Sequence, residues 1–162
     1  GRLGLTFAPG KCGRGVYANW DRSLAKDLAR LRDEYGTKVL VTLIEAFEMK
    51  RASIPTLRQS ARRAGMKSLW FPITDVSTPR FPEDPIPIVR EVLEHLAAGD
   101  TVVVHCMGGL GRAGTIAACV LAARDVEPDK AVEVVRAARP GALETPAQVA
   151  FVGLFQEAWL SR

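Results

Sequence analysis

The chain has 162 residues, of which 48% are hydrophobic and 25% are charged, as in ordinary soluble globular proteins. Its 22 basic and 18 acidic residues give a net charge of +4, which favours acidic or phosphorylated partners through electrostatic steering. No basic stripe is interleaved with aromatic residues, so the sequence argues against nucleic acid as a ligand. No apolar run is long enough to span a membrane and no signal peptide is visible, so we expect no membrane partner.

The pattern along the chain alternates between helices and strands, which predicts an α/β fold with a central, mainly parallel sheet flanked by helices. Apolar periodicity and end signals predict helices over residues 21–35, 54–64, 86–98, 112–124, 128–138 and 146–160. Apolar, β-branched runs predict strands over residues 38–44, 68–72 and 101–105. No linker or repeat divides the chain, so residues 1–162 are predicted to form one domain.

The most informative stretch is residues 105–112, His-Cys-Met-Gly-Gly-Leu-Gly-Arg, between a predicted strand and a predicted helix. Its three glycines allow the backbone to curl tightly, so that several N–H groups and the helix dipole form an anion-binding nest. Arg112 adds a planar fork that binds a tetrahedral oxyanion through two bonds. The phosphate-binding residues are therefore predicted to be Met107, Gly108, Gly109, Leu110, Gly111 and Arg112.

Cys106 lies at the base of this loop, where the field that holds an anion also favours a thiolate. A thiolate beneath a bound phosphate is placed for in-line attack at phosphorus, which makes Cys106 the predicted nucleophile. No Gly-Lys-Ser/Thr follows the glycines, so a nucleotide-binding P-loop is excluded. Three cysteines, one of them required as a thiolate, indicate a reducing cytoplasm rather than a disulfide scaffold.

The loop resembles the signature loop of the cysteine-dependent protein tyrosine phosphatases, and the short chain resembles their dual-specificity branch. Further likeness, to the kinase-associated phosphatases of that branch, lies in Leu3-Gly4-Leu5, Pro9-Gly10, residues 72–75, Thr78-Pro79, residues 142–145 and Gln148. The resemblance implies a dual-specificity phosphatase-like fold, with residues 1–162 as a single phosphatase catalytic domain. It also implies hydrolysis of phosphotyrosine, phosphoserine and phosphothreonine monoesters through a cysteinyl-phosphate, on a phosphorylated protein or peptide.

The leaving oxygen of the substrate needs a proton, and Asp75 is the predicted general acid because it follows a strand on a proline-stiffened loop. In the resembled family an Asp in this position is the acid, whereas the residues alone leave a turn-forming role equally open. Asp84 is the second choice and Glu83 the third. His105 is predicted to orient the loop rather than to exchange protons.

Gln148 matches a glutamine that helps to place the attacking water in related enzymes, although an exposed residue early in the last helix is an equally good interpretation. Neither histidine has acidic partners in a metal-ligand pattern, so we expect no metal and no cofactor. We also expect a monomer.

Most members of the resembled family place Ser or Thr directly after the loop arginine, and Ala113 stands there instead. Without that hydroxyl, the release of the cysteine thiolate in the second step is expected to be slower.

Two other classes of protein stay open. The chain could instead be a phosphatase-like module that captures phosphopeptides with little turnover, and Ala113 is compatible with that interpretation. A sulfurtransferase or arsenate reductase also places a cysteine in an anion-binding loop, but usually with another loop length and no preceding acid. Relatives that act on inositol phospholipids carry lysines within the loop, so the neutral Met107, Gly108 and Leu110 argue against such a substrate. Arg80 or Lys11 could still contribute charge from outside the loop.

Overall fold

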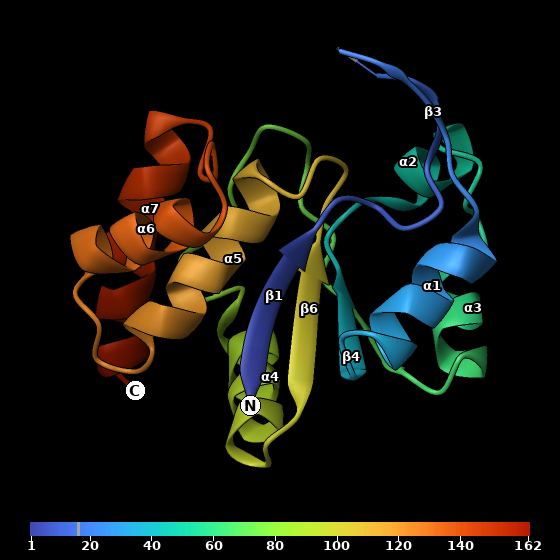
Figure 1. Ribbon diagram of the computed structural model, residues 1–162. Coiled ribbons are helices and arrows are strands. Elements are labelled where there is room, and N and C mark those ends of the chain that lie inside the picture. The colour runs from blue at the N-terminus through green and yellow to red at the C-terminus, as the bar shows by residue number, and fades with distance from the viewer. Residues whose placement is uncertain (16) are drawn as a thin grey trace.

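The computed structural model describes residues 1–15 and 17–162 and has a four-stranded parallel sheet at its centre (Figure 1). The strand order is β1-β6-β4-β5. The strands are β1 (Arg2–Thr6), β4 (Thr37–Thr42), β5 (Lys67–Trp70) and β6 (Thr101–His105). The predicted α/β class with a mainly parallel sheet is confirmed. The two inner strands, β4 and β6, are buried along most of their length, as the β-branched and apolar runs predict.

Helices cover both faces of the sheet. They are α1 (Leu24–Asp33), α2 (Ala46–Arg51), α3 (Leu57–Arg63), α4 (Ile86–Ala97), α5 (Gly111–Ala122), α6 (Pro128–Ala138) and α7 (Pro146–Leu160). Helix α5 packs against β1 and β6, and α6 and α7 pack on its outer side, whereas α1 and α3 lie on the opposite face (Figure 1). Within residues 1–15 and 17–162, no helix is both long and apolar enough to cross a bilayer.

Every predicted helix and strand is present, with ends that differ by a few residues. The helix predicted over 21–35 begins later, at Leu24, because the Ser23 hydroxyl accepts the Lys26 N–H at 3.3 Å and caps it. Thr145 caps α7 in the same way, and its side chain and that of Gln148 form a reciprocal capping box. Four elements were not predicted: β1, α2 and the two strands of a hairpin, β2 (Cys12–Arg14) and β3 (Asn19–Asp21).

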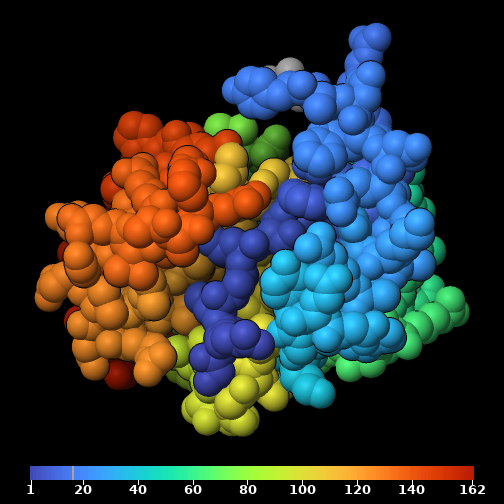
Figure 2. Space-filling view, in the orientation of Figure 1, coloured from blue at the N-terminus to red at the C-terminus, as the bar shows by residue number. Residues whose placement is uncertain are grey.

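Because the four sheet strands are parallel, the loops that follow them meet at one edge of the sheet. Residues 7–11 follow β1, residues 43–45 follow β4, residues 71–85 follow β5, and residues 106–110 follow β6. The antiparallel β2–β3 hairpin projects above the same edge (Figures 1 and 2). The fold therefore brings the predicted nucleophile loop and the predicted acid loop together.

Candidate active site

The loop of residues 106–110 connects β6 to α5 and lies against the segment that follows β1. Gly109 has a φ of +72°, and a Cβ there would collide with the backbone of Thr6. The Ala8 N–H donates to the Met107 carbonyl at 3.1 Å, which fixes the two segments together. Cys106 is buried at the base of the loop, directly after the strand. Only glycine satisfies both the positive φ and the close approach at position 109.

Two cationic side chains bind successive carbonyl groups of this loop from outside. Lys11 Nζ donates to the Met107 carbonyl at 3.2 Å, and Arg139 donates to those of Gly108 and Gly109 at 3.2 and 3.3 Å. A carbonyl held by an outer cation points away from the centre of the loop, which leaves the centre to the amide groups. Sequence analysis did not assign this role to either residue, because Arg139 and Lys11 lie far along the chain from the carbonyls they bind.

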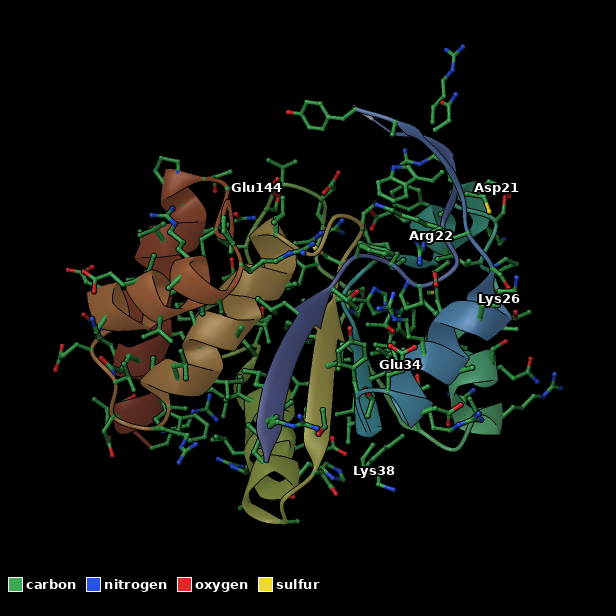
Figure 3. All side chains as sticks on the ribbon, viewed as in Figure 1. Asp21, Arg22, Lys26, Glu34, Lys38 and Glu144 are labelled. Carbon is green, nitrogen blue, oxygen red and sulfur yellow. The ribbon has the colours of Figure 1, made fainter. Side chains whose placement is uncertain are left out.

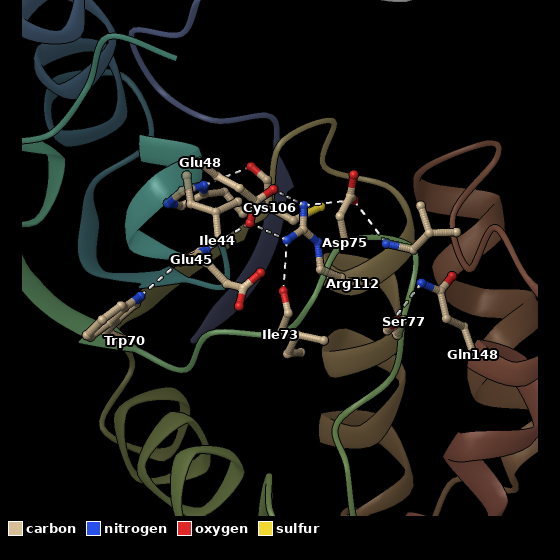
Figure 4. Close-up of polar contacts among 12 residues, drawn as sticks. Ile44, Glu45, Glu48, Trp70, Ile73, Asp75, Ser77, Cys106, Arg112 and Gln148 are labelled. Carbon is tan, nitrogen blue, oxygen red and sulfur yellow. Dashed lines mark hydrogen bonds and ion pairs between the residues drawn. The ribbon is translucent and has the colours of Figure 1, made fainter. Parts of the chain in front are cut away.

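The guanidinium of Arg112, the second residue of α5, is held by a carboxylate that sequence analysis missed. Its Nη1 donates to Glu48 Oε2 at 2.8 Å and its Nη2 to Glu48 Oε1 at 2.9 Å (Figure 4). Nη1 also donates to the Ile73 carbonyl at 2.9 Å. The side chains of Arg112 and Glu48 are only 2% and 0% exposed. This two-bond pair fixes the plane of the guanidinium at the rim of the loop.

Glu48 joins the arginine to a short helix, α2, next to the loop. Its Oε2 also accepts the Glu45 N–H at 2.8 Å and so satisfies a free amide at the start of that helix. Burial pushes the pKa of the Glu48 carboxyl upward, but the bonds from Arg112 and Glu45 and the charge of Arg112 hold it below its ordinary value. The pair is therefore ionised, and Arg112 stays oriented without a ligand.

Asp75 lies beside the same arginine, as the sequence predicts for the acid. Its Oδ1 is 3.0 Å from Nη2 of Arg112, although its side chain is 58% exposed (Figure 4). The same oxygen accepts the Val76 N–H at 3.0 Å, so Asp75 also makes the turn contact considered in the sequence analysis. Asp84, the second choice, accepts the Phe81 N–H at 2.9 Å in a separate turn, and Glu83 is exposed. The structure thus brings Asp75 to Arg112, and neither Asp84 nor Glu83 forms an ion pair with it.

His105, the last residue of β6, is fully buried beside β4. Its Nδ1 lies 3.0 Å from the Cys106 carbonyl and its Nε2 lies 2.8 Å from the Thr42 hydroxyl. Because a carbonyl can only accept, Nδ1 carries the proton and Nε2 accepts from Thr42. Burial, together with the nearby Arg112 charge, lowers the pKa of His105 to about 4. A neutral ring with both nitrogens bonded fits the predicted orienting role.

Gln148 is fully buried, so the interpretation of an exposed residue is wrong. Its Oε1 accepts the Glu144 and Thr145 N–H groups at 2.8 and 3.2 Å. Its Nε2 donates to the Ser77 carbonyl at 3.2 Å (Figure 4). A Cβ on Gly111 would also lie within 3.0 Å of the Gln148 amide. Gln148 therefore links the start of α7 to the loop that carries Asp75.

Comparisons with known proteins agree with this arrangement. Residues 12–125 match the family model described as a polymorphic toxin system DSP-PTPase phosphatase. Cyclin-dependent kinase inhibitor 3 of rat is 28% identical over 162 residues, covering 96% of this chain and 72% of its own length. The human protein of that name is 27% identical over 158 residues, with the same coverage.

Two solved structures have the same architecture over nearly the whole chain. Kinase associated phosphatase with its catalytic-site cysteine changed to serine has a TM-score of 0.87 and 25% identity, covering 99% of this chain and 88% of its own. Tk-PTP in its active form has a TM-score of 0.78 and 28% identity, covering 97% and 92%.

Fold and relatives together define a phosphatase of the dual-specificity type, an enzyme that hydrolyses phosphoric monoesters. The chain belongs to the family of polymorphic toxin system DSP-PTPase phosphatases, because that model matches most of its length. The resemblance to dual-specificity phosphatases that the sequence predicted is confirmed.

Proposed function

We propose that the protein is a cysteine-dependent phosphatase that removes phosphate from phosphotyrosine, phosphoserine or phosphothreonine in a phosphorylated protein or peptide. The observation that carries this proposal is the meeting of Cys106, Arg112 and Asp75 at the carboxyl end of β6 and β5. Residues 1–162 act as one catalytic domain and as a monomer, and no metal or cofactor takes part. Within the described residues, no cluster of His, Cys, Asp and Glu is arranged to hold a metal ion.

In the first step the substrate phosphate occupies the loop above Cys106. The thiolate attacks phosphorus, a sulfur–phosphorus bond forms, and the ester bond to the substrate oxygen breaks. Amide groups of residues 107–112 and the Arg112 guanidinium stabilise the charge that builds on the equatorial oxygens. The carbonyl contacts of Lys11 and Arg139 support this step, because they hold the loop with its amides facing inward.

Arg112 must change one partner when substrate arrives. Both hydrogens of Nη1 are used by Glu48 and Ile73, whereas Nη2 is shared between Glu48 and Asp75. A bound phosphate takes the Nη2 hydrogen that faces Asp75, together with Nε, which donates to no other group in the described part of the chain. Asp75 is released from Arg112, takes up a proton from solvent and donates that proton to the leaving oxygen.

In the second step, water attacks the cysteinyl-phosphate, inorganic phosphate leaves, and the thiolate forms again. Asp75, now a carboxylate, accepts a proton from that water. Gln148 holds the acid loop through Ser77 and lies against Gly111, which supports a positioning role in this step. Ala113 is fully buried and supplies no hydroxyl to the departing thiolate, so this step is expected to limit the rate.

A reducing compartment suits this chemistry, because an oxidised Cys106 cannot attack phosphorus. Cys12, Cys106 and Cys119 are all free thiols. We therefore place the protein in the cytoplasm.

The test is hydrolysis of a small aryl phosphate and of a panel of phosphopeptides by the wild type and by Cys106→Ser. Turnover that EDTA does not affect and that Cys106→Ser abolishes supports the proposal. Binding of phosphopeptides without turnover would indicate a capture module instead. Transfer of sulfur from thiosulfate would indicate a sulfurtransferase, and release of arsenite from arsenate would indicate a reductase. Asp75→Ala serves in the same panel to retain bound substrates.

A further inference from the structure

A basic cavity lies beside the phosphate loop and is lined by none of Cys106, Arg112 and Asp75. Its volume is about 370 Å³, and it lies between the β2–β3 hairpin, the end of α2 and the loop. Its lining includes Lys11, Cys12, Arg14, Trp20, Arg51 and Met107. Met107, which directly follows Cys106, belongs to both the cavity lining and the phosphate loop, so the cavity adjoins that loop. Figures 1 and 2 show the hairpin projecting over this edge of the molecule.

Lys11 is the unusual residue of this cavity, because the whole residue is only 7% exposed. Its ammonium lies 3.8 Å from the centre of the Trp20 ring and donates one hydrogen bond, to the Met107 carbonyl. An ammonium has three donors, and within residues 1–15 and 17–162 no carboxylate lies within ion-pair distance of Lys11. The charge of Cys106 acts favourably on this buried cation, but two of its donors have no carboxylate partner, so an anion from outside would be stabilised there.

The surroundings of Lys11 strengthen this need for an anion. Burial lowers the pKa of the Lys11 ammonium, and the charges of Arg22 and Arg139 lower it further, whereas Cys106 acts in the opposite sense. Arg14 and Arg51 are exposed at the rim and form no ion pair in the described part of the chain. The neighbouring Asp21 accepts the Cys12 thiol at 3.9 Å and does not pair with these cations.

We propose that this cavity, with Lys11 at its base, binds a second anionic group on the substrate, placed beside the phosphorylated residue. The inference rests on the proposed function and refines it, since it names the kind of protein segment that the site accepts. The shared chemistry is an anionic oxygen, supplied by a Glu or Asp side chain or by a second phosphate. A cavity of this size holds such a group together with part of its side chain.

The experiment compares kcat/KM for matched phosphopeptides that differ at one flanking position, Glu against Gln and phosphoserine against serine, with each flanking position tested in turn. The wild type is expected to prefer the anionic member at one position by about tenfold, the worth of one hydrogen bond between charged groups. Lys11→Met should bring that ratio close to one, and Lys11→Arg should keep most of it. The Glu and phosphoserine peptides distinguish a carboxylate from a phosphate ligand.

The matched control is Lys38→Met, which removes the same charge from an exposed residue at the start of β4. Figure 3 shows Lys38 at the far end of the sheet from Asp21 of the hairpin. This variant should keep the wild-type ratio. If Lys38→Met lost the preference for the anionic peptide, overall charge and not the cavity would set that preference. This result would overturn the proposal.

Binding of the same peptides to the Cys106→Ser form, measured by fluorescence anisotropy, separates this inference from the proposed function. A preference for the anionic peptide in binding without any turnover in the wild type would contradict the proposed function and support the cavity. Turnover with no preference at any flanking position would overturn the cavity. If Lys11→Met keeps the preference for the anionic peptide but shifts the acid limb of the pH profile of kcat/KM, Lys11 acts on Cys106 instead. That result would also overturn the cavity proposal. Faster hydrolysis of a soluble inositol polyphosphate than of every peptide would likewise overturn the proposal that the cavity binds a segment of a protein substrate.

Discussion

Glu48→Gln tests whether the buried carboxylate is what orients Arg112. Glu48 Oε2 accepts two donors, the Glu45 N–H and Nη1 of Arg112, so an amide nitrogen in that place would face two N–H groups. The alternative rotamer leaves Arg112 with a single bond to residue 48, through the new amide oxygen, and removes the buried charge that balances the guanidinium. Because both side chains are nearly or fully buried, breaking the pair should cost about 3–5 kcal/mol.

For a chain of this length that loss corresponds to a fall in Tm of roughly 10 °C, measured by circular dichroism on heating. At temperatures where the variant stays folded, kcat/KM for a phosphopeptide should fall by about tenfold to a hundredfold, because Arg112 loses its fixed plane. The control is Glu133→Gln, whose carboxylate is 68% exposed and pairs with Lys130. That surface pair is worth at most about 1 kcal/mol, so Tm should hardly change. A Tm of Glu48→Gln within about 2 °C of wild type, with unchanged kcat/KM, would refute the reasoning.

Two further substitutions test the second chemical step and the buried histidine. Ala113→Ser should raise steady-state turnover by roughly tenfold, because one hydrogen bond to the departing thiolate speeds hydrolysis of the cysteinyl-phosphate; identical single-turnover and steady-state rates in both forms would contradict this. His105 has a pKa of about 4 when folded against an ordinary 6.5, so the unfolded chain binds a proton first as the pH falls. The wild type should therefore lose about 3 kcal/mol of unfolding free energy between those pH values that His105→Gln does not lose, in urea titrations. Parallel pH curves for the two forms would show that His105 does not titrate in this way.

The parts of the site that are contiguous in sequence could be predicted. Residues 105–112 carry the nucleophile, the glycines and the arginine within one strand-loop-helix unit, so their chemistry is visible without the fold. Asp75 was predicted from its place after a strand together with the family resemblance, because the residues alone left a turn-forming role equally open. The structure brings it to Arg112, but along the chain these residues are well separated.

The parts that depend on long-range contacts could not be predicted. Glu48 lies 64 residues from Arg112, and its helix, α2, is only six residues long and shows no apolar stripe. Strand β1 contains Gly4 in its centre, which lowers strand propensity, and forms by pairing with β6, which lies far along the chain. Lys11 and Arg139 bind the loop carbonyls through contacts that no local pattern encodes.

The most direct test of the central claim is to find where the phosphoryl group goes during turnover. The wild type is mixed with a phosphopeptide, quenched in acid within the first turnovers, digested and analysed by mass spectrometry. Because Ala113 is expected to slow the second step, we expect one phosphoryl group on the peptide that contains Cys106. We expect none in Cys106→Ser, which should also show no turnover. A phosphoryl group on any other residue, or turnover that persists in Cys106→Ser, would contradict the account.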